Sequence, residues 1–302
     1  MIHKINSKII SKFVAGVILL LPLIFYSWRA SLRPPITNSE KVLFQGIIYQ
    51  RKIYSTSRPF IVHTVEIDLT TPGIKPFITP PKSISTISNN PALTTSEFIK
   101  KFNLQLAVNG SFFYRFHERT PWNYYPKSGE PTNVLGQSIS NNLKYGKPES
   151  RWDILCFTKP NIAQISNQKK CPGGTVWGIA GGDTLVIDGK SKINYDTPSY
   201  ARTAVATNKK GDKLWLIVVD GKQPFYSEGA TLKELAEIAI NLGADRALNL
   251  DGGGSTTLAI ANGNSTKVLN APIHNKIPMN ERPLANHLGF YGMPKTQFTD
   301  RE

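Results

Sequence analysis

Cysteine is scarce in this chain, which has only Cys156 and Cys171 among 302 residues. Without a second pair of cysteines, the chain cannot form a zinc site of the paired-cysteine kind. No EF-hand spacing is present, so we expect no metal and no cofactor. The alternative is a Ca²⁺ ion bound by Asp-rich loops. A Walker lysine motif is also missing, which argues against the alternative that D-G-G-G-S-T at 251–256 is the phosphate loop of a sugar kinase of the actin-like class.

Acidic residues are also few, at 21 against 36 Lys and Arg, and the formal net charge is +15. Such a surplus favours anionic partners: a phosphorylated glycan, an anionic membrane face or a nucleic acid. The sequence has no cluster of basic residues interleaved with aromatics and no nucleic-acid-binding motif. We therefore expect no nucleic acid as a partner.

Residues 1–33 contain no acidic side chain at all, and sixteen uncharged residues follow one another at 13–28. That run is slightly short for a membrane span of about 20 residues, although tilt or local thinning can cover the gap. No convincing small-residue cleavage site follows it. The sequence therefore predicts a basic cytoplasmic N-terminus at 1–12, a signal anchor (transmembrane segment) at 13–28 and a linker at 29–41. A cleaved signal peptide is the alternative, and it would make the protein secreted.

Either alternative places the domain outside the cytoplasm, in a periplasmic or extracellular location. Disulfides persist in such compartments, whereas in the cytosol Cys156 and Cys171 would be two unrelated thiols. The two cysteines lie near the facing ends of two expected strands, 152–158 and 174–180. We therefore predict a Cys156–Cys171 disulfide, which closes a loop of about 15 residues and contributes roughly 3 kcal/mol under the chain-entropy model.

Runs rich in Val, Ile, Phe and Tyr predict strands along most of the chain. The expected strands include 42–51, 59–69, 74–79, 104–113, 152–158, 174–180, 184–187, 202–207, 213–219 and 247–250. Helices are expected at 91–102 and 231–242, and the second has the capping-box spacing of Thr231 and Glu234. We predict a mixed α/β (α+β) fold: a single domain over 42–302 with a mixed, largely antiparallel sheet and a few helices.

Two of the expected strands end in an aspartate followed by glycine. The strand 213–219 leads into Asp220, and the strand 247–250 leads into Asp251 and three glycines. Because a helix lies between them, a strand-helix-strand unit would place both carboxylates at one edge of a sheet, on neighbouring strands. They are the best acid/base pair in the sequence, although a glycine-rich turn with Asp at its corner explains the second one almost as well.

The segment 114–136 is too long and too aromatic for a plain connector. It predicts a rim on which sugar rings stack, and the alternative is an Ω-loop packed by its own side chains. The candidate rim residues are His117, Trp122, Tyr124 and Tyr125.

Five short motifs, in one order along the chain, carry a resemblance to a known family. They are V-N-G-S-F-F at 108–113, the segment 178–190, A-R-T-A at 201–204, N-L-D-G-G-G-S-T at 249–256 and E-R-P-L-A-N at 281–286. Together they resemble the phosphodiester glycosidase family, the group that contains the lysosomal uncovering enzyme that removes N-acetylglucosamine from a phosphodiester. The resemblance covers about two-thirds of the chain, with its core motifs within 104–292. The N-terminal strands and the loop at 121–126 look like a membrane-anchored or secreted bacterial subgroup.

The resemblance implies a hydrolase that cleaves a sugar-1-phosphodiester, on cell-envelope glycans, into free sugar and a phosphomonoester. Asp251, Asp220 or Glu281 would supply the nucleophile or the base. Paired guanidinium donors match phosphate oxygens, and sugar hydroxyls suit amide side chains. The expected substrate-binding residues are Arg202, Arg282, the backbone of Gly252, Gly253 and Gly254, the hydroxyls of Ser255 and Thr256, and the amides of Asn109 and Asn286. The alternative function is a non-catalytic envelope module that binds anionic or phosphorylated glycans through the same cleft.

Overall fold

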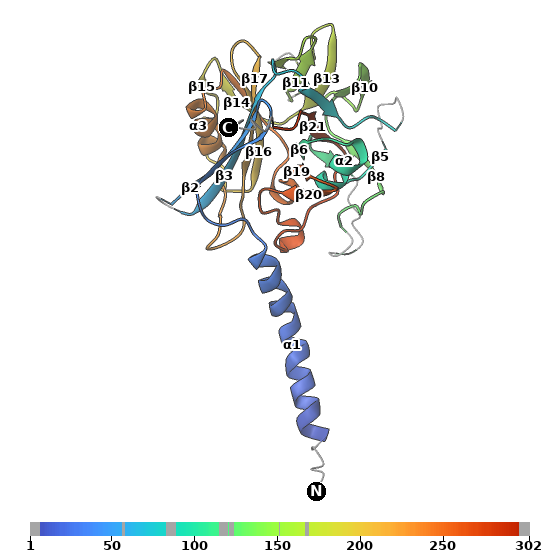
Figure 1. Cartoon of the computed structure of the whole chain (residues 1–302), viewed down its shortest axis with the longest axis vertical. Coiled ribbons are helices and arrows are strands. Elements are labelled where there is room, and N and C mark those ends of the chain that lie inside the picture. The colour runs from blue at the N-terminus through green and yellow to red at the C-terminus, as the bar shows by residue number, and fades with distance from the viewer. Residues whose placement is uncertain are drawn as a thin grey trace, which may run out of the picture.

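The computed structural model describes residues 7–55, 58–82, 89–114, 120, 124–150, 152–166 and 169–295, with side chains from residue 18 onward. In this part of the chain, antiparallel sheets form one domain, and a long N-terminal helix projects from it (Figure 1). The α-helices are α1 (Ser7–Ser31), α2 (Thr95–Phe102) and α3 (Leu232–Asn241). Short 3₁₀ turns are η2 (Gly253–Ser255) and η3 (His274–Lys276).

The largest sheet has eight strands in the order β1-β2-β3-β17-β16-β18-β14-β15. Its strands are β1 (Ser39–Phe44), β2 (Ile47–Tyr54), β3 (Phe60–Asp68), β14 (Thr184–Ile187), β15 (Lys190–Ser191), β16 (Arg202–Thr207), β17 (Lys213–Val219) and β18 (Arg246–Asn249). Its central strands are apolar on both faces because both faces are covered. Along β17, Leu214 and Leu216 belong to one hydrophobic core, and the alternating Trp215 and Ile217 belong to another core that includes the apolar face of α3.

Two five-stranded sheets contribute to the other core. One has the order β10-β9-β13-β11-β12 and the other the order β20-β19-β6-β21-β4, while β5, β8 and β7 form a small third sheet. Their bounds are β4 (Lys75–Ile78), β5 (Asn90–Pro91), β6 (Leu106–Asn109), β7 (Phe113–Tyr114), β8 (Pro131–Val134), β9 (Ser138–Ser140), β10 (Leu143–Tyr145), β11 (Ile154–Thr158), β12 (Ile162–Ser166), β13 (Thr175–Ala180), β19 (Leu258–Asn262), β20 (Ser265–Val268) and β21 (His287–Tyr291). The predicted α+β fold, with a largely antiparallel sheet and a few helices in a single domain, is confirmed.

Some element boundaries differ from the prediction for local reasons. The expected strand at 42–51 is a hairpin of β1 and β2, because Gly46 adopts φ +68°, a left-handed conformation that turns the chain. Helix α2 begins only at Thr95, because Thr94 and Glu97 form a capping box that fixes the first turn there. The same device starts α3, where Thr231 accepts from the backbone N–H of Glu234.

The ends of β17 and β18 meet at one edge of the large sheet. Both strands pair antiparallel with β16, so they run in the same direction on either side of it. Asp220 and Asp251 therefore leave the sheet at the same edge, and Arg202 at the start of β16 lies between them. The prediction of one shared edge is right, but the two strands are not neighbours, because β16 separates them.

Helix α1 is attached to the domain at its C-terminal end (Figure 1). There the Nε of Arg29 donates to the backbone oxygen of Pro278 at 3.0 Å, and a second nitrogen of Arg29 contacts the oxygen of Met279. Within the part of the chain that the structure describes, no helix is both long and apolar enough to cross a membrane. The signal anchor expected at 13–28 is therefore not supported, and the side chains of residues 13–17 lie outside the described part.

The predicted disulfide is present between Cys156 and Cys171, whose Cα atoms are 5.7 Å apart. Cys156 lies on β11 opposite Gly178 of β13. A Cβ atom at Gly178 would lie 3.1 Å from the sulfur of Cys171, so the glycine leaves the room that the bridge needs. The bridge joins β11, an inner strand of this sheet, to the loop before β13.

Candidate active site

The glycine segment after β18 passes between two other parts of the chain. A Cβ on Gly252 would lie 2.8 Å from the carbonyl oxygen of Ala201, and a Cβ on Gly254 would overlap the guanidinium of Arg282. Glycine is therefore required here for close approach. Two of the N–H groups expected to face an anion have internal partners: Gly252 donates to the Oδ1 of Asp251 at 2.9 Å, and Gly253 donates to Ala201 at 2.8 Å.

Asp251 is a partly exposed carboxylate at the edge of a pocket of about 380 Å³, which we call the sugar pocket. Burial of the carboxyl against the protein raises its pKa to about 6, although the Ser255 hydroxyl and the positive charge of Arg282 act in the opposite direction. Such a group changes its charge near neutral pH and still reaches a pocket. This combination is typical of catalytic carboxylates.

The wall of the sugar pocket contains aromatic and amide side chains. Phe112 and Tyr200 offer ring surface, and Asn249 lies beside Asp251 on the same strand end. Asn249 is only 4% exposed, and its Oδ1 has no hydrogen-bond partner among the described residues. An unpartnered buried acceptor at a pocket indicates a place for a ligand donor. Asn249 was not predicted as a site residue, although it begins the N-L-D-G-G-G motif.

Arg202, which we predicted to bind phosphate, lines the sugar pocket, but much of its guanidinium already bonds to the backbone. Its Nε donates to the backbone oxygen of Ala230 at 3.1 Å, and one terminal nitrogen donates to Pro198 at 2.9 Å. Burial lowers its pKa from the usual value, although the group stays far above neutrality and therefore charged. Arg202 therefore contributes a fixed positive charge rather than a free bidentate clamp.

A second pocket of about 620 Å³ lies on the Gly254 side of the glycine segment, and we call it the basic pocket. Arg282 forms part of its wall, with its guanidinium 3.9 Å from the ring centroid of Tyr125. The Nη1 of Arg282 donates to the hydroxyl of Ser255 at 3.1 Å. Since Ser255 also bonds to Asp251, it links the arginine to the carboxylate. The structure thus brings Asp251, Ser255 and Arg282 together.

His274 in η3 is a further residue of this site that sequence reasoning missed. Its Nδ1 accepts a hydrogen bond from the Nε of Arg282 at 3.1 Å, so the other ring nitrogen carries the proton of the neutral form. Burial, with the adjacent charge of Arg282, lowers the pKa of His274 to about 4, and the ring is therefore neutral at pH 7. No local pattern marks this histidine, since its role depends on a residue eight positions away.

The predicted rim is only partly described. Tyr125 lies edge-on to His274 with the ring centroids 4.9 Å apart, and Tyr124 packs edge-on to Tyr125 at 4.9 Å. These two tyrosines therefore border the basic pocket through Arg282 and His274. His117 and Trp122 lie outside the described residues.

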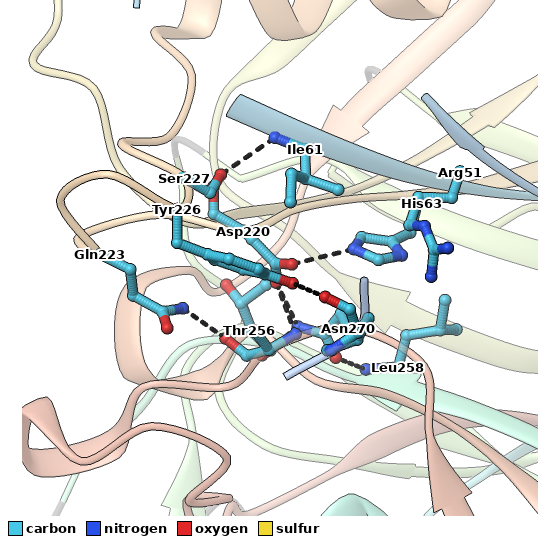
Figure 2. A network of polar contacts seen from close by, with 12 residues as sticks. Arg51, Ile61, His63, Asp220, Gln223, Tyr226, Ser227, Thr256, Leu258 and Asn270 are labelled. Carbon is cyan, nitrogen blue, oxygen red and sulfur yellow. Dashed lines mark hydrogen bonds and ion pairs between the residues drawn. The ribbon is translucent and has the colours of Figure 1, made fainter. Parts of the chain in front are cut away.

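Asp220 occupies a different environment, shown in Figure 2. It is fully buried, and its Oδ2 bonds to the Nε2 of His63 at 2.9 Å. Its Oδ1 accepts from the Nδ2 of Asn270 at 3.0 Å and from the N–H of Ala271 at 2.8 Å. Asp220 lines neither of the two pockets described above. This position does not fit the predicted catalytic role, because every contact of the carboxylate is internal.

The network around Asp220 supports the glycine segment from behind. Asn270 also donates to the backbone oxygen of Thr256 at 3.1 Å and accepts from the N–H of Leu258 at 2.8 Å (Figure 2). On the other side, His63 bonds to the hydroxyl of Tyr49 at 2.8 Å. Asp220 is therefore an anchor for the chain that carries the site.

The two asparagines expected to hold sugar hydroxyls are fully buried and bond to protein groups instead. The Nδ2 of Asn109 donates to the backbone oxygen of Asp251 at 2.6 Å, so it fixes the segment that carries the carboxylate. Asn286 accepts from the N–H of Ser111 at 2.9 Å and donates to the hydroxyl of Ser138 at 3.0 Å. Both positions correct the predicted role: these residues shape the site without lining it.

Glu281 and Thr256 likewise face away from the two pockets. Glu281 accepts from the backbone N–H of Ser96 at 3.0 Å, in the first turn of α2, where a negative charge suits the helix N-terminus. Burial raises the pKa of Glu281 above its usual value. Thr256 is 1% exposed and contributes its backbone oxygen to Asn270. Glu281 therefore stabilises α2, which does not fit its predicted catalytic role.

A family profile covers the part of the chain that carries this site. The profile described as phosphodiester glycosidase matches residues 102–291, which is more than half of the chain. The chain belongs to the phosphodiester glycosidase family. As a member of this family it is a hydrolase of phosphodiester glycosidic bonds. A search of curated proteins gives no match to the sequence.

Solved structures show that the fold is shared with other proteins of low sequence identity. The catalytic domain of zebrafish N-acetylglucosamine-1-phosphodiester alpha-N-acetylglucosaminidase, auto-inhibited by its pro-peptide, is 17% identical, with a TM-score of 0.58 over 89% of this chain and 93% of that one. A hypothetical protein from Synechocystis is 17% identical, with a TM-score of 0.54 over 86% of this chain. The chain spans 64% of that protein's length. A putative exported protein from Burkholderia pseudomallei is 14% identical, with a TM-score of 0.54 over 78% of this chain and 74% of that one.

The residues of the two pockets suit a phosphodiester glycosidase. Asp251 is the carboxylate among the residues that line them, and Arg282 supplies a desolvated positive charge beside it. Among the described residues, no group of three His, Cys, Asp or Glu side chains could hold a metal ion.

Proposed function

We propose that this chain hydrolyses a sugar-1-phosphodiester to the free sugar and a phosphomonoester, with the sugar in the sugar pocket. The observation that carries this proposal is the linked trio of Asp251, Ser255 and Arg282, which joins a pocket-lining carboxylate to a cation on the other side of the glycine segment. The phosphate would lie beside Arg282, where a guanidinium matches phosphate oxygens.

In the proposed reaction, the bond between the anomeric carbon and the phosphate oxygen breaks, and the electron pair leaves with the phosphate. Water supplies the oxygen of the free sugar, and Asp251 either attacks the carbon first or takes the proton of that water. A phosphate leaves as a stabilised anion, so the reaction needs a general acid less than ordinary glycoside cleavage does. Among the described residues that line the two pockets, Asp251 is the one carboxylate, which suits such a reaction.

For the sugar, we propose N-acetylglucosamine as the first substrate to test, because the zebrafish relative is named for it. Phe112 and Tyr200 provide ring surface for the apolar face of a sugar, and the free Oδ1 of Asn249 would accept from a hydroxyl or an amide. A cell-envelope glycan carrying such phosphodiesters is the substrate that we infer.

We also propose that the domain works outside the cytoplasm. The Cys156–Cys171 disulfide supports this location, because such bridges persist in oxidising compartments. Protease protection of the chain in intact cells tests it: digestion only after disruption of the outermost membrane supports a periplasmic domain. Recovery in the membrane pellet or in the medium would distinguish an anchored protein from a secreted one, and complete recovery in the cytosol would contradict the proposal.

The activity test uses N-acetylglucosamine α-1-phosphate esterified to 4-nitrophenol. We expect free sugar and 4-nitrophenyl phosphate, which an added phosphatase converts to a coloured product. Asp251→Asn should lower turnover about a thousandfold. Asp188→Asn is the matched control, because Asp188 is an exposed turn residue between β14 and β15.

Hydrolysis in ¹⁸O-labelled water identifies the bond that breaks. Label in the sugar supports cleavage at the anomeric carbon, whereas label in the phosphate would identify a phosphodiesterase and contradict the proposal. Equal turnover by wild type and Asp251→Asn would contradict the assignment of Asp251. Binding of several such phosphodiesters without any turnover would instead favour a non-catalytic glycan-binding module.

A further inference from the structure

We propose that the basic pocket binds a second anionic group of the substrate, a phosphate that follows the scissile one in a phosphodiester chain. The inference rests on the proposed function, because it assigns the leaving part of that substrate to this pocket. Its lining consists of Tyr125, Lys222, Gly254, Ile273, Asn275, Lys276, Ile277 and Arg282. Three of these residues are cations, and none is acidic.

The position of the basic pocket is where the leaving group would emerge. Gly254 closes against Arg282, and Gly252 and Gly253 border the sugar pocket, so a segment of three glycines separates the two pockets. Arg282, which packs against Gly254, itself lines the basic pocket. A phosphate held beside Arg282 would therefore direct its ester substituent into the basic pocket.

The two lysines of the basic pocket have no carboxylate partner. In the described part of the chain, neither Lys222 nor Lys276 forms an ion pair, and both side chains are exposed. The Nζ of Lys222 lies 3.8 Å from the ring centroid of Tyr200, which itself lines the sugar pocket. The charge of Lys222 is thus held at the border between the two pockets, where an anionic ligand would meet it.

The backbone gives a second, independent indication. Lys222 has φ +57° and Lys276 has φ +61°, both in the left-handed region that glycine adopts without penalty. For a lysine this conformation costs roughly 1–2 kcal/mol, so the turns themselves would favour glycine or asparagine at both positions. Lys169 shares this conformation outside the basic pocket, so the meeting of two such lysines, from two loops, at one pocket is what points to a use for their charged side chains.

A pair of substrates with the same sugar tests the inference. One is the propyl ester of N-acetylglucosamine α-1-phosphate, and the other is the 3-phosphopropyl ester, which carries a second phosphate. For wild type we expect kcat/KM at least tenfold higher with the second ester, and the advantage should shrink as salt is added. Lys222→Gln with Lys276→Gln should remove this advantage, so that kcat/KM becomes about equal for the two esters.

The control is Lys209→Gln with Lys210→Gln, which removes the same charge from an exposed turn at the opposite end of β16. This variant should keep the preference for the phosphorylated ester. Equal kcat/KM of wild type for the two esters would overturn the inference. An equal loss of kcat/KM for both esters in the Lys222 and Lys276 variant would also overturn it. Removal of the preference by the control variant would also overturn it, because net charge alone would then explain the effect.

A binding measurement separates this inference from the proposed function. Propane-1,3-diol bisphosphate contains the two phosphates without the sugar, and calorimetry measures its affinity even if no ester is hydrolysed. We expect binding to wild type and to Asp251→Asn, and affinity at least tenfold weaker for the Lys222 and Lys276 variant. Equal affinity for all three proteins, or no binding to any of them, would overturn the inference whatever the activity.

Discussion

Strands β17 and β18 end at the same edge of one sheet, and each is followed by an aspartate and a glycine. The two aspartates nevertheless have different roles. Asp220 is fully buried and bonds to His63, Asn270 and Ala271. Asp251 is partly exposed, lines a pocket and has a raised pKa. The difference comes from what covers each strand end, and it teaches that a strand-end aspartate becomes a candidate catalyst only where a pocket stays open beside it.

The largest effect on stability is expected at Asp220. Asp220→Ala leaves the donors of Asn270 and Ala271 without an acceptor inside the protein, which should lower the free energy of unfolding by about 3 kcal/mol or more. Asp220→Asn keeps an acceptor and should cost less. Urea unfolding measures both variants, and a stability of Asp220→Ala equal to that of wild type would remove the contrast with Asp251.

At the other strand end, Asn249→Ala tests whether the free amide oxygen binds substrate. Loss of a hydrogen bond to the sugar should raise KM about tenfold, which corresponds to about 1.4 kcal/mol, with a smaller change in kcat. Stability should not fall by much, because the Oδ1 has no partner to lose. A normal KM combined with a large loss of stability would assign Asn249 to the fold instead.

The raised pKa of Asp251 predicts that the stability of the protein depends on pH. The folded pKa of about 6 is higher than that of an unfolded aspartate, near 4, so the folded state holds this proton more tightly. The associated stabilisation is complete below about pH 4 and is lost as pH rises through about 6. Relative to wild type, Asp251→Asn should therefore gain roughly 1 kcal/mol between pH 4 and pH 7, after allowance for solvent screening.

Unfolding in urea at several pH values, for wild type and Asp251→Asn, measures this difference. Turnover by wild type should rise with pH through about 6, as the carboxylate forms. A stability difference that is constant across this range would show that Asp251 titrates normally, and the contrast between the two strand ends would weaken.

The smallest effect is expected two residues beyond Asp220, at Lys222. Lys222→Gly, and likewise Lys276→Gly, should leave stability unchanged or raise it by about 0.5 kcal/mol, because glycine accepts the left-handed conformation without strain. Lys209→Gly in the exposed turn after β16 is a comparison substitution for the effect of introducing glycine. Thermal unfolding measures these variants. A clear loss of stability in Lys222→Gly would show that the Lys222 side chain stabilises the fold, as Asp220 at the end of β17 does.

Local signals in the sequence predicted much of the fold. The capping-box spacing of Thr231 and Glu234 predicted where α3 begins, whereas the start of α2 was predicted at residue 91 instead of Thr95. The apolar runs before Asp220 and Asp251 predicted β17 and β18. The turn at Gly46 was missed because the apolar pattern continues across it. The candidate site was predictable where a motif carries its own chemistry, as at Asp251 and Arg282.

The remaining assignments depended on contacts between distant residues. His63 lies 157 positions from Asp220, and Asn270 lies 50 positions from it, so no local pattern could show that they surround this carboxylate. The amides of Asn109 and Asn286 look the same in the sequence whether they face a sugar or the backbone. His274 acquires its neutral state only from burial and the nearby arginine.

The sequence by itself determined the family motifs, the strand ends and the two aspartates at one sheet edge, because these follow from patterns within a few residues. Only the tertiary structure decided that Asp251 meets a pocket while Asp220 meets His63 and Asn270. The physical reason is that burial and charge depend on which segments pack against each group, and those segments come from distant parts of the chain. The same packing placed Lys222 and Lys276, from two separate loops, around one pocket.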